Sequence, residues 1–98
     1  MKKQPAVYIM ANGYRGTLYV GVTSSLTHRV FQHREAEIKG SFTEKYGCKN
    51  LVYYEFFETM FDAITREKQL KGGSRQKKIE LIAGMNPDWK DLYEFICY

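Results

Sequence analysis

A chain of 98 residues, 44% of them apolar, is long enough for a single compact domain over residues 1–98 with a modest core. The formal net charge of +4 favours an anionic partner, and no apolar stretch approaches the length that crosses a membrane. The N-terminus lacks the apolar run of a signal peptide. The spacing of Cys48 and Cys97 resembles neither a disulfide framework nor a metal site, so we expect a cytoplasmic protein.

The first part of the chain alternates β-forming residues with a turn. Residues 6–11 and 17–22 are rich in β-branched and aromatic side chains, which predicts two strands. Residues 12–16 between them carry the Asn and Gly residues of a hairpin turn. We therefore expect an antiparallel hairpin in which Tyr8 and Tyr19 face each other.

A helix and a third strand are expected next. Ser24 or Ser25 can cap the helix, apolar residues recur in it at helical spacing, and Gly40 can end it. Residues 41–49 are expected to form a loop. Residues 50–57 are heavy in β-formers, and their apolar character predicts a central strand that is buried on both faces.

Three more helices are predicted toward the C-terminus. The first begins at Thr59 with a pattern that resembles a capping box, and the glycine pair 72–73 ends it. Ser74 caps the second, which Gly84 ends, and the Asn-Pro pair at 86–87 is typical of the start of a last helix that reaches the C-terminus. This order of elements implies an α+β fold, with one largely antiparallel sheet flanked by helices.

Charge is distributed unevenly along the chain. Asp88, Asp91 and Glu94 gather near the C-terminus, away from a basic run in which Glu67 is the only acid. A basic face of this kind fits phosphate binding, but most charge runs are solvated helix faces, so charge alone leaves both interpretations open. The basic run consists of Arg66, Lys68, Lys71, Arg75, Lys77 and Lys78.

Several residues in the first half of the chain are candidates for chemistry. Opposed tyrosines such as Tyr8 and Tyr19 are commonplace packing, but Gly21 follows closely, and a glycine inside a strand often marks a close approach by another group. Arg29 and His33 are four residues apart, so they share one helix face. The arginine can hold a phosphate oxygen, whereas the histidine alone could equally be a surface residue.

Two further residues have both a functional and a structural interpretation. Glu67 follows Ala63 by four residues and precedes Leu70 by three, a line that should face the sheet, where a carboxylate needs a partner such as Mg²⁺. The alternative is an ordinary pair with Lys71 at i, i+4 on a surface helix. Asn86 is equally ambiguous, because Asn before Pro is an ordinary helix cap.

Taken together, these residues resemble the GIY-YIG nuclease family, in particular its short stand-alone bacterial members. The likeness covers roughly residues 5–92, and order, spacing and identity agree at several separate places. These places are the tripeptides Ala6-Val7-Tyr8 and Tyr19-Val20-Gly21, the residues Arg29, His33 and Glu67, and the segments 63–72 and 86–89.

The resemblance implies a three-stranded antiparallel sheet with flanking helices and an active site with a single Mg²⁺ or Mn²⁺ ion. It implies that Tyr8 or Tyr19 is the general base on the attacking water, and that Arg29 stabilises charge on the scissile phosphate. Glu67 would hold the metal, and His33 would contact phosphate or activate a tyrosine. A free tyrosine has a pKa of about 10, so we expect the arginine or the metal to lower the pKa of the base.

The implied function is a metal-dependent endonuclease acting on nucleic acid, above all DNA, in repair or recombination, and a protein partner could target it. Gly21, Asn86 and the basic run would contact the nucleic acid. A binding module that keeps the fold but has little turnover is the first alternative. The second is a protein-interaction domain that uses the aromatic residues Tyr53, Tyr54, Phe56 and Phe57.

Overall fold

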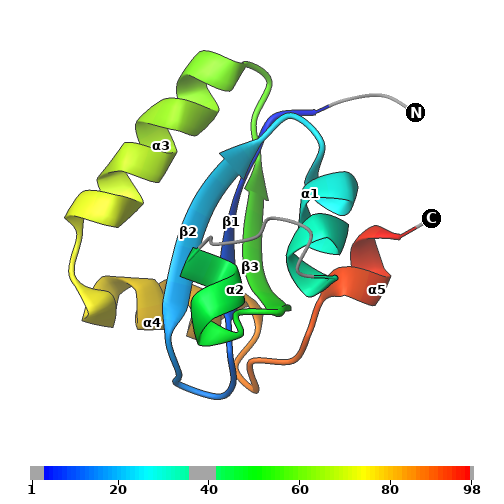
Figure 1. The fold of residues 1–98 in the computed structure, drawn as a ribbon. Helices are drawn as coiled ribbons and strands as arrows, with labels where there is room; N and C mark the ends of the chain where they lie inside the picture. Colours follow the sequence, from blue (N-terminus) through cyan, green and yellow to red (C-terminus); the bar gives the residue numbers. More distant parts are fainter. Residues whose placement is uncertain (1–3, 36–41, 98) are drawn as a thin grey trace.

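The computed structural model describes residues 4–35 and 42–97, which form one three-stranded sheet with helices packed on it (Figure 1). This arrangement confirms the predicted α+β class. None of the helices in these two ranges is long and apolar enough to cross a membrane. The elements are β1 (Ala6–Ala11), β2 (Leu18–Thr23), α1 (Leu26–Arg34), α2 (Phe42–Tyr46), β3 (Asn50–Phe56), α3 (Met60–Gly72), α4 (Arg75–Met85) and α5 (Tyr93–Ile96).

The central strand of the sheet is β1, which pairs antiparallel with β2 on one side and with β3 on the other. Every residue of β1 is buried. The prediction that residues 50–57 form the central strand is therefore wrong, because β3 lies at an edge and its last residue, Phe56, is 45% exposed. Both segments are apolar enough for a buried strand, so composition could not decide which of them has two neighbours.

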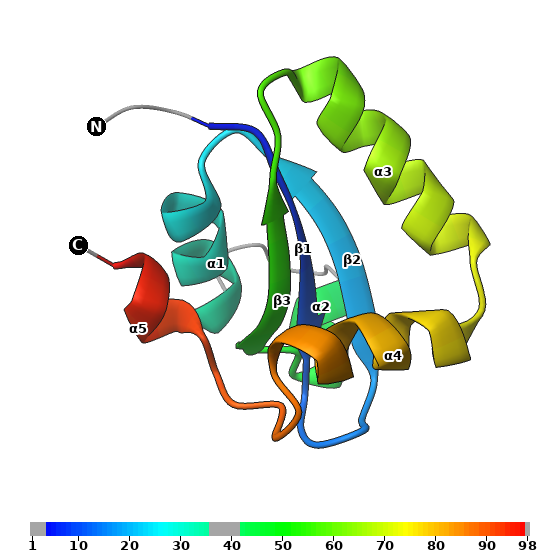
Figure 2. The same ribbon diagram turned by 180° about the vertical axis from the view of Figure 1, so that it is seen from behind.

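The two faces of the sheet are covered by different helices. Figures 1 and 2 show α1 and α5 on one side of the sheet and α3 and α4 on the other. Side chains alternate along β1 accordingly: Val7 and Ile9 pack in the cluster that contains Leu70 of α3, whereas Tyr8 and Met10 pack in the cluster that contains residues of α1. A side chain of β1 therefore belongs to one of two separate clusters according to its position in the strand.

Local capping chemistry positions α3 and α4 as predicted. The Thr59 hydroxyl accepts a hydrogen bond from the Asp62 N–H at 3.2 Å, and the Ser74 hydroxyl accepts one from the Lys77 N–H at 3.2 Å. The predicted end of α4 at Gly84 is wrong by one residue, because the helix continues to Met85 and Asn86 is its C-cap.

Two predicted features of the middle segment have different outcomes. Residues 41–49 were expected to be a loop, but they contain the short helix α2. The helix α1 begins after Ser25, one of its two expected caps, and ends at Arg34. Its predicted end, Gly40, lies outside the described residues.

The short C-terminal helix predicted over residues 87–98 is wrong in its start and length, since α5 begins at Tyr93 and has only four residues. The Asn86 side chain holds the preceding segment in a turn: it donates to the Lys90 carbonyl at 2.7 Å and accepts from the Lys90 N–H at 3.0 Å. Trp89 has a φ of 56°, a left-handed conformation that interrupts a right-handed helix. The turn places the indole in the core, where it is 5% exposed.

Candidate active site

The first and second predicted tyrosines meet on one face of the sheet, although they are not directly opposite. Tyr8 pairs in register with Gly21, and Tyr19 pairs with Met10, so the two phenols are diagonal neighbours with ring centroids 6.3 Å apart. A Cβ atom at Gly21 would lie 2.4 Å from the Tyr8 hydroxyl oxygen. The glycine therefore lets the Tyr8 ring lie across β2, which is the close approach that the sequence indicated.

His33 of α1 completes an aromatic cluster with the two tyrosines. The Tyr8 hydroxyl lies 2.8 Å from His33 Nε2, and the His33 ring centroid is 5.5 Å from that of Tyr19. His33 is 3% exposed, so the alternative of a surface histidine is wrong. Sequence alone did not indicate its burial, because that depends on the packing of this face of α1 against the sheet.

The electrostatic environment keeps the Tyr8 hydroxyl protonated. Burial raises the pKa of Tyr8 above its ordinary value, and the charge of an ionised Tyr19 raises it further. Arg29 opposes this through its charge and a hydrogen bond to the hydroxyl, but the net direction is upward. Arg29 thus lowers the pKa of Tyr8 as expected, but burial outweighs it, because the fully buried phenolate would lose its hydration.

The environment of His33 keeps its imidazole neutral. Burial lowers the pKa of His33 to about 4, and the positive charge of Arg29 acts in the same direction. A neutral imidazole has one ring nitrogen that accepts a hydrogen bond. The tautomer of the neutral imidazole therefore decides whether His33 Nε2 accepts from the Tyr8 O–H or donates to its oxygen.

Glu67 comes from α3, yet it acts electrostatically on the same hydroxyl. Its negative charge is the smallest of the influences that raise the pKa of Tyr8, which places the carboxylate near the cluster. The Glu67 side chain is 16% exposed and binds the Lys71 ammonium at 3.0 Å. The i, i+4 pair that sequence left open is thus present, and the carboxylate also acts electrostatically on Tyr8.

The side chains around the cluster offer a metal ion one carboxylate. Within the described ranges, no group of three or more His, Cys, Asp or Glu residues could hold a metal by itself. Mg²⁺ and Mn²⁺ suit such a site, because they prefer oxygen ligands and Mg²⁺ keeps several waters beside one or two carboxylates. Glu67 therefore fits a cation whose shell is completed by water and substrate phosphate, and it does not fit a closed zinc site.

Exposure divides the five predicted residues into an inner and an outer group. Tyr8 is fully buried and His33 nearly so, and neither can contact a substrate in this conformation. Tyr19, Arg29 and Glu67 are partly exposed. The outer group can reach a substrate directly, whereas the inner pair supports it from within the protein.

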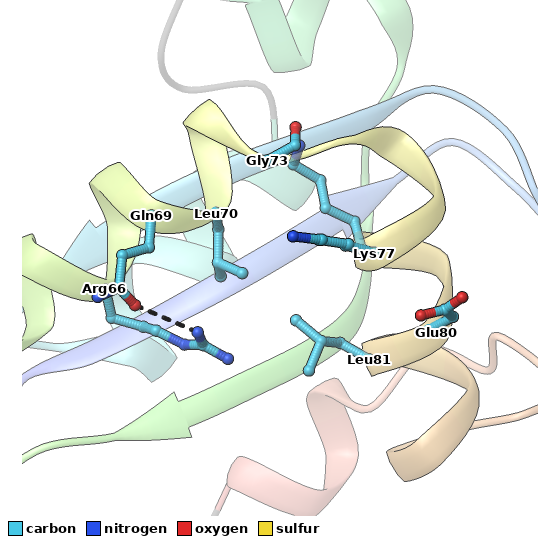
Figure 3. Close-up of a pocket in the computed structure, with 8 residues that line it drawn as sticks. Arg66, Gln69, Leu70, Gly73, Lys77, Glu80 and Leu81 are labelled. Atoms are coloured by element: carbon cyan, nitrogen blue, oxygen red, sulfur yellow. Dashed lines mark hydrogen bonds between the residues drawn. The ribbon is translucent and has the colours of Figure 1, made fainter.

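Arg66 and Lys77, from the predicted basic run, face a pocket between α3 and α4. The pocket has a volume of about 490 Å³ (Figure 3). Arg66 binds the Glu55 carboxylate at 3.1 Å and the Gln69 side chain at 3.3 Å, so the charge of Glu55 balances that of Arg66. Glu80 also lines this pocket. Lys78 lines this pocket too, and it also lines the hollows beside β2, where Lys71 and Arg75 lie. Lys68 is exposed on α3.

The structure uses Asn86 and Asp91 to hold the C-terminal segment. Asn86 is 6% exposed and donates to the carbonyls of Val52 and Lys90, which occupies both of its amide hydrogens. Asp91 pairs with Arg34 and accepts from the Leu51 N–H at 3.0 Å. Neither side chain is free to contact a phosphate, in contrast to the role expected for Asn86.

Sequence reasoning missed Leu18 and Val20, which line hollows along β2 together with the lysines of α3 and α4. Both are apolar residues in an edge strand, and their residue types carry no sign of a binding surface. The register of β2 against β1 and the packing of α3 on β2 bring them there.

Comparisons with known proteins agree on one family. The sequence model of the GIY-YIG catalytic domain matches residues 4–80. UPF0213 protein SSP2268 of Staphylococcus saprophyticus is 35% identical over 68 residues, which cover 69% of this chain and 82% of that protein. UPF0213 protein SAV0488 of Staphylococcus aureus is 36% identical over 67 residues, covering 68% and 80% respectively.

A solved structure has the same fold. The solution NMR structure of UPF0213 protein BH0048 from Bacillus halodurans matches with a TM-score of 0.56 at 23% sequence identity. The match covers 97% of this chain and 99% of that one. At this identity the likeness concerns the fold alone.

Proposed function

The chain belongs to the GIY-YIG catalytic domain family, and on that premise we propose that it is an endonuclease that hydrolyses phosphodiester bonds in nucleic acid, above all DNA. The observation that carries the proposal is the meeting of two phenols, an imidazole and a guanidinium on one face of the sheet, with a carboxylate close by. Hydrolysis of a phosphodiester requires an activated water, neutralised phosphate charge and a stabilised leaving oxygen. The cluster contains a candidate for each requirement.

We assign the general base to Tyr19 and a positioning role to Tyr8 and His33. Tyr19 is partly exposed and can contact an attacking water, whereas Tyr8 and His33 are buried behind it. The Tyr8–His33 hydrogen bond and the ring contacts of both residues with Tyr19 fix the orientation of its phenol. Tyr19→Phe should therefore abolish cleavage, whereas His33→Gln should reduce it by disordering the tyrosine pair.

We assign to Arg29 and Glu67 the task of neutralising the negative charge of the phosphate. Arg29 can donate two parallel hydrogen bonds to phosphate oxygens. Glu67 would hold a single Mg²⁺ or Mn²⁺ ion, which when bound supplies positive charge at the scissile phosphate. Lys71 pairs with Glu67 through Oε2, so the other carboxylate oxygen would remain for the metal.

The test is a cleavage assay on a panel of labelled DNA and RNA structures, with Mg²⁺ or Mn²⁺ and with chelator. Wild type is compared with Glu67→Ala and Arg29→Ala, and Glu58→Ala removes the same charge from an exposed carboxylate as a control. We expect metal-dependent cleavage by wild type and Glu58→Ala, and none by the other two. Cleavage by a folded Glu67→Ala protein would exclude the metal role of this residue.

A nucleic-acid-binding module with little turnover is the second candidate, and one observation favours it. Glu67 is paired with Lys71, and the ammonium reduces the negative charge that the carboxylate can offer to a metal. The two functions differ in the same assay: a binder retains labelled DNA in chelator and leaves it intact when Mg²⁺ or Mn²⁺ is added.

A further inference from the structure

Two adjoining hollows along β2 form one shallow groove, which we call the β2 groove. Their volumes are about 320 Å³ and 260 Å³, and they share three lining residues, Leu18, Val20 and Lys78. One hollow adds Thr17 and Arg75 near the β1–β2 turn, and the other adds Tyr19 and Lys71. The groove thus runs along β2 from the turn to Tyr19, the residue that we assign as the general base and whose side chain packs on the other face of the sheet.

The charge of the β2 groove is positive without compensation from its own lining. Its three ionisable lining side chains other than Tyr19 are the cations Lys71, Arg75 and Lys78. Two of them are held in place: the Arg75 guanidinium donates to the Arg15 and Gly16 carbonyls at 2.6 and 2.8 Å, and Lys78 donates to the Gly73 carbonyl at 3.0 Å. Neutral carbonyls orient these cations without cancelling their charge.

The backbone of β2 adds polar groups to the same surface. β2 is an edge strand, so alternate peptide N–H and C=O groups have no partner in the sheet. Backbone N–H groups that point away from the sheet, beside lysine and arginine, form the kind of surface that contacts phosphate oxygens. The pocket between α3 and α4 differs, because Glu80 lines it and Glu55 binds its arginine, Arg66.

We propose that the β2 groove holds the sugar-phosphate backbone of the nucleic-acid strand that leads into the active site. The proposal rests on the function proposed above and deepens it. It divides the basic run: Lys71, Arg75 and Lys78 line the β2 groove and neutralise substrate phosphates, whereas Lys77 does not line the groove and neutralises none. Both Lys77 and Lys78 border the α3–α4 pocket (Figure 3), but only Lys78 also reaches the groove. Lys77 and Lys78 are therefore adjacent in sequence but differ in function.

The salt dependence of DNA affinity shows which lysines neutralise substrate phosphates. Each neutralised phosphate contributes about 0.9 to the slope of log affinity against log salt for duplex DNA and about 0.7 for a single strand. Lys78→Gln should therefore reduce the magnitude of the slope by about 0.7–0.9. Lys71→Gln should reduce it by less in chelator, because Glu67 pairs with Lys71 there. Lys77→Gln removes the same charge one residue away and should leave the slope as in wild type.

The experiment titrates a fluorescein-labelled DNA duplex and a labelled single strand with the full chain, by anisotropy in chelator at several NaCl concentrations. Lys78→Arg keeps the charge and should retain the wild-type slope, which separates loss of a phosphate contact from loss of folding. Equal slopes for Lys78→Gln and Lys77→Gln, with wild type binding DNA, would overturn the groove assignment.

The two proposals fail in different ways. Wild type that binds with the expected differences but does not cleave with Mg²⁺ or Mn²⁺ contradicts the nuclease and supports the groove. Wild type that cleaves while the two lysine variants behave alike supports the nuclease and contradicts the groove. Wild type that does not bind either probe contradicts both proposals.

Discussion

Gly21→Ala tests the packing that brings the two tyrosines together. The added methyl group would lie 2.4 Å from the Tyr8 hydroxyl oxygen and 2.5 Å from its Cζ atom, so one of the groups must move. Tyr8 has little room to move, because its side chain is fully buried and bonded to His33. Position 21 does not have a left-handed φ, so the strain of the variant is steric.

The expected loss of stability follows from two contributions. Forcing a methyl group into a packed site costs about 1–3 kcal/mol. Displacing the Tyr8 hydroxyl from His33 costs about 1 kcal/mol more. We therefore expect Gly21→Ala to lower the free energy of unfolding by about 2–4 kcal/mol, a large part of the total for a domain of this size.

Urea unfolding followed by circular dichroism measures this change, and Gly84→Ala is the matched control. Gly84 lies inside α4 and a Cβ there would meet no atom within 4 Å, so the same substitution should stabilise the protein by up to about 1 kcal/mol. An unfolding midpoint for Gly21→Ala equal to that of wild type would refute the reasoning, since the Tyr8 ring would then not depend on this glycine.

Two further predictions concern buried polar side chains. The pKa of His33 is lowered from 6.5 to about 4, so between these pH values the unfolded state binds more protons than the folded state. The free energy of unfolding should therefore decrease as the pH is lowered, by about 3 kcal/mol between pH values above 6.5 and pH 4. His33→Phe should flatten that part of the profile in urea titrations at stepped pH; an unchanged profile would contradict the buried neutral imidazole. Asn86→Ala leaves the buried Val52 carbonyl without its partner and should cost about 2–3 kcal/mol in unfolding free energy. The same variant should leave the salt dependence of DNA binding unchanged, and a reduced slope would restore the nucleic-acid role expected from sequence.

Features that depend on neighbours in the chain were predictable from sequence. The caps Thr59 and Ser74 bond to N–H groups three residues away, so their residue types suffice to place the starts of α3 and α4. Gly21 was also informative, because a glycine within a strand often marks a place where another group approaches the backbone closely, here the Tyr8 ring. The linear order of the family's residues then indicated which side chains to look for.

Features that depend on distant partners were not predictable in this way. The sequence next to Asn86 resembles a helix start. Its side chain instead donates hydrogen bonds to the Val52 carbonyl, 34 residues away, and to the Lys90 carbonyl in the following turn. The central position of β1 and the edge position of β3 likewise depend on pairing between segments. Local patterns cannot specify such pairings, because each segment alone is compatible with several partners.

The sequence by itself determined the family, the three strands and the residue types of the candidate site. Only the tertiary structure decided that Tyr8 and His33 are buried while Tyr19 remains partly exposed. It also decided that Lys78 lines the β2 groove, whereas Lys77 lines only the pocket between α3 and α4. The reason is that exposure and direction belong to the packing of layers, in which residues adjacent in the chain can face different neighbours.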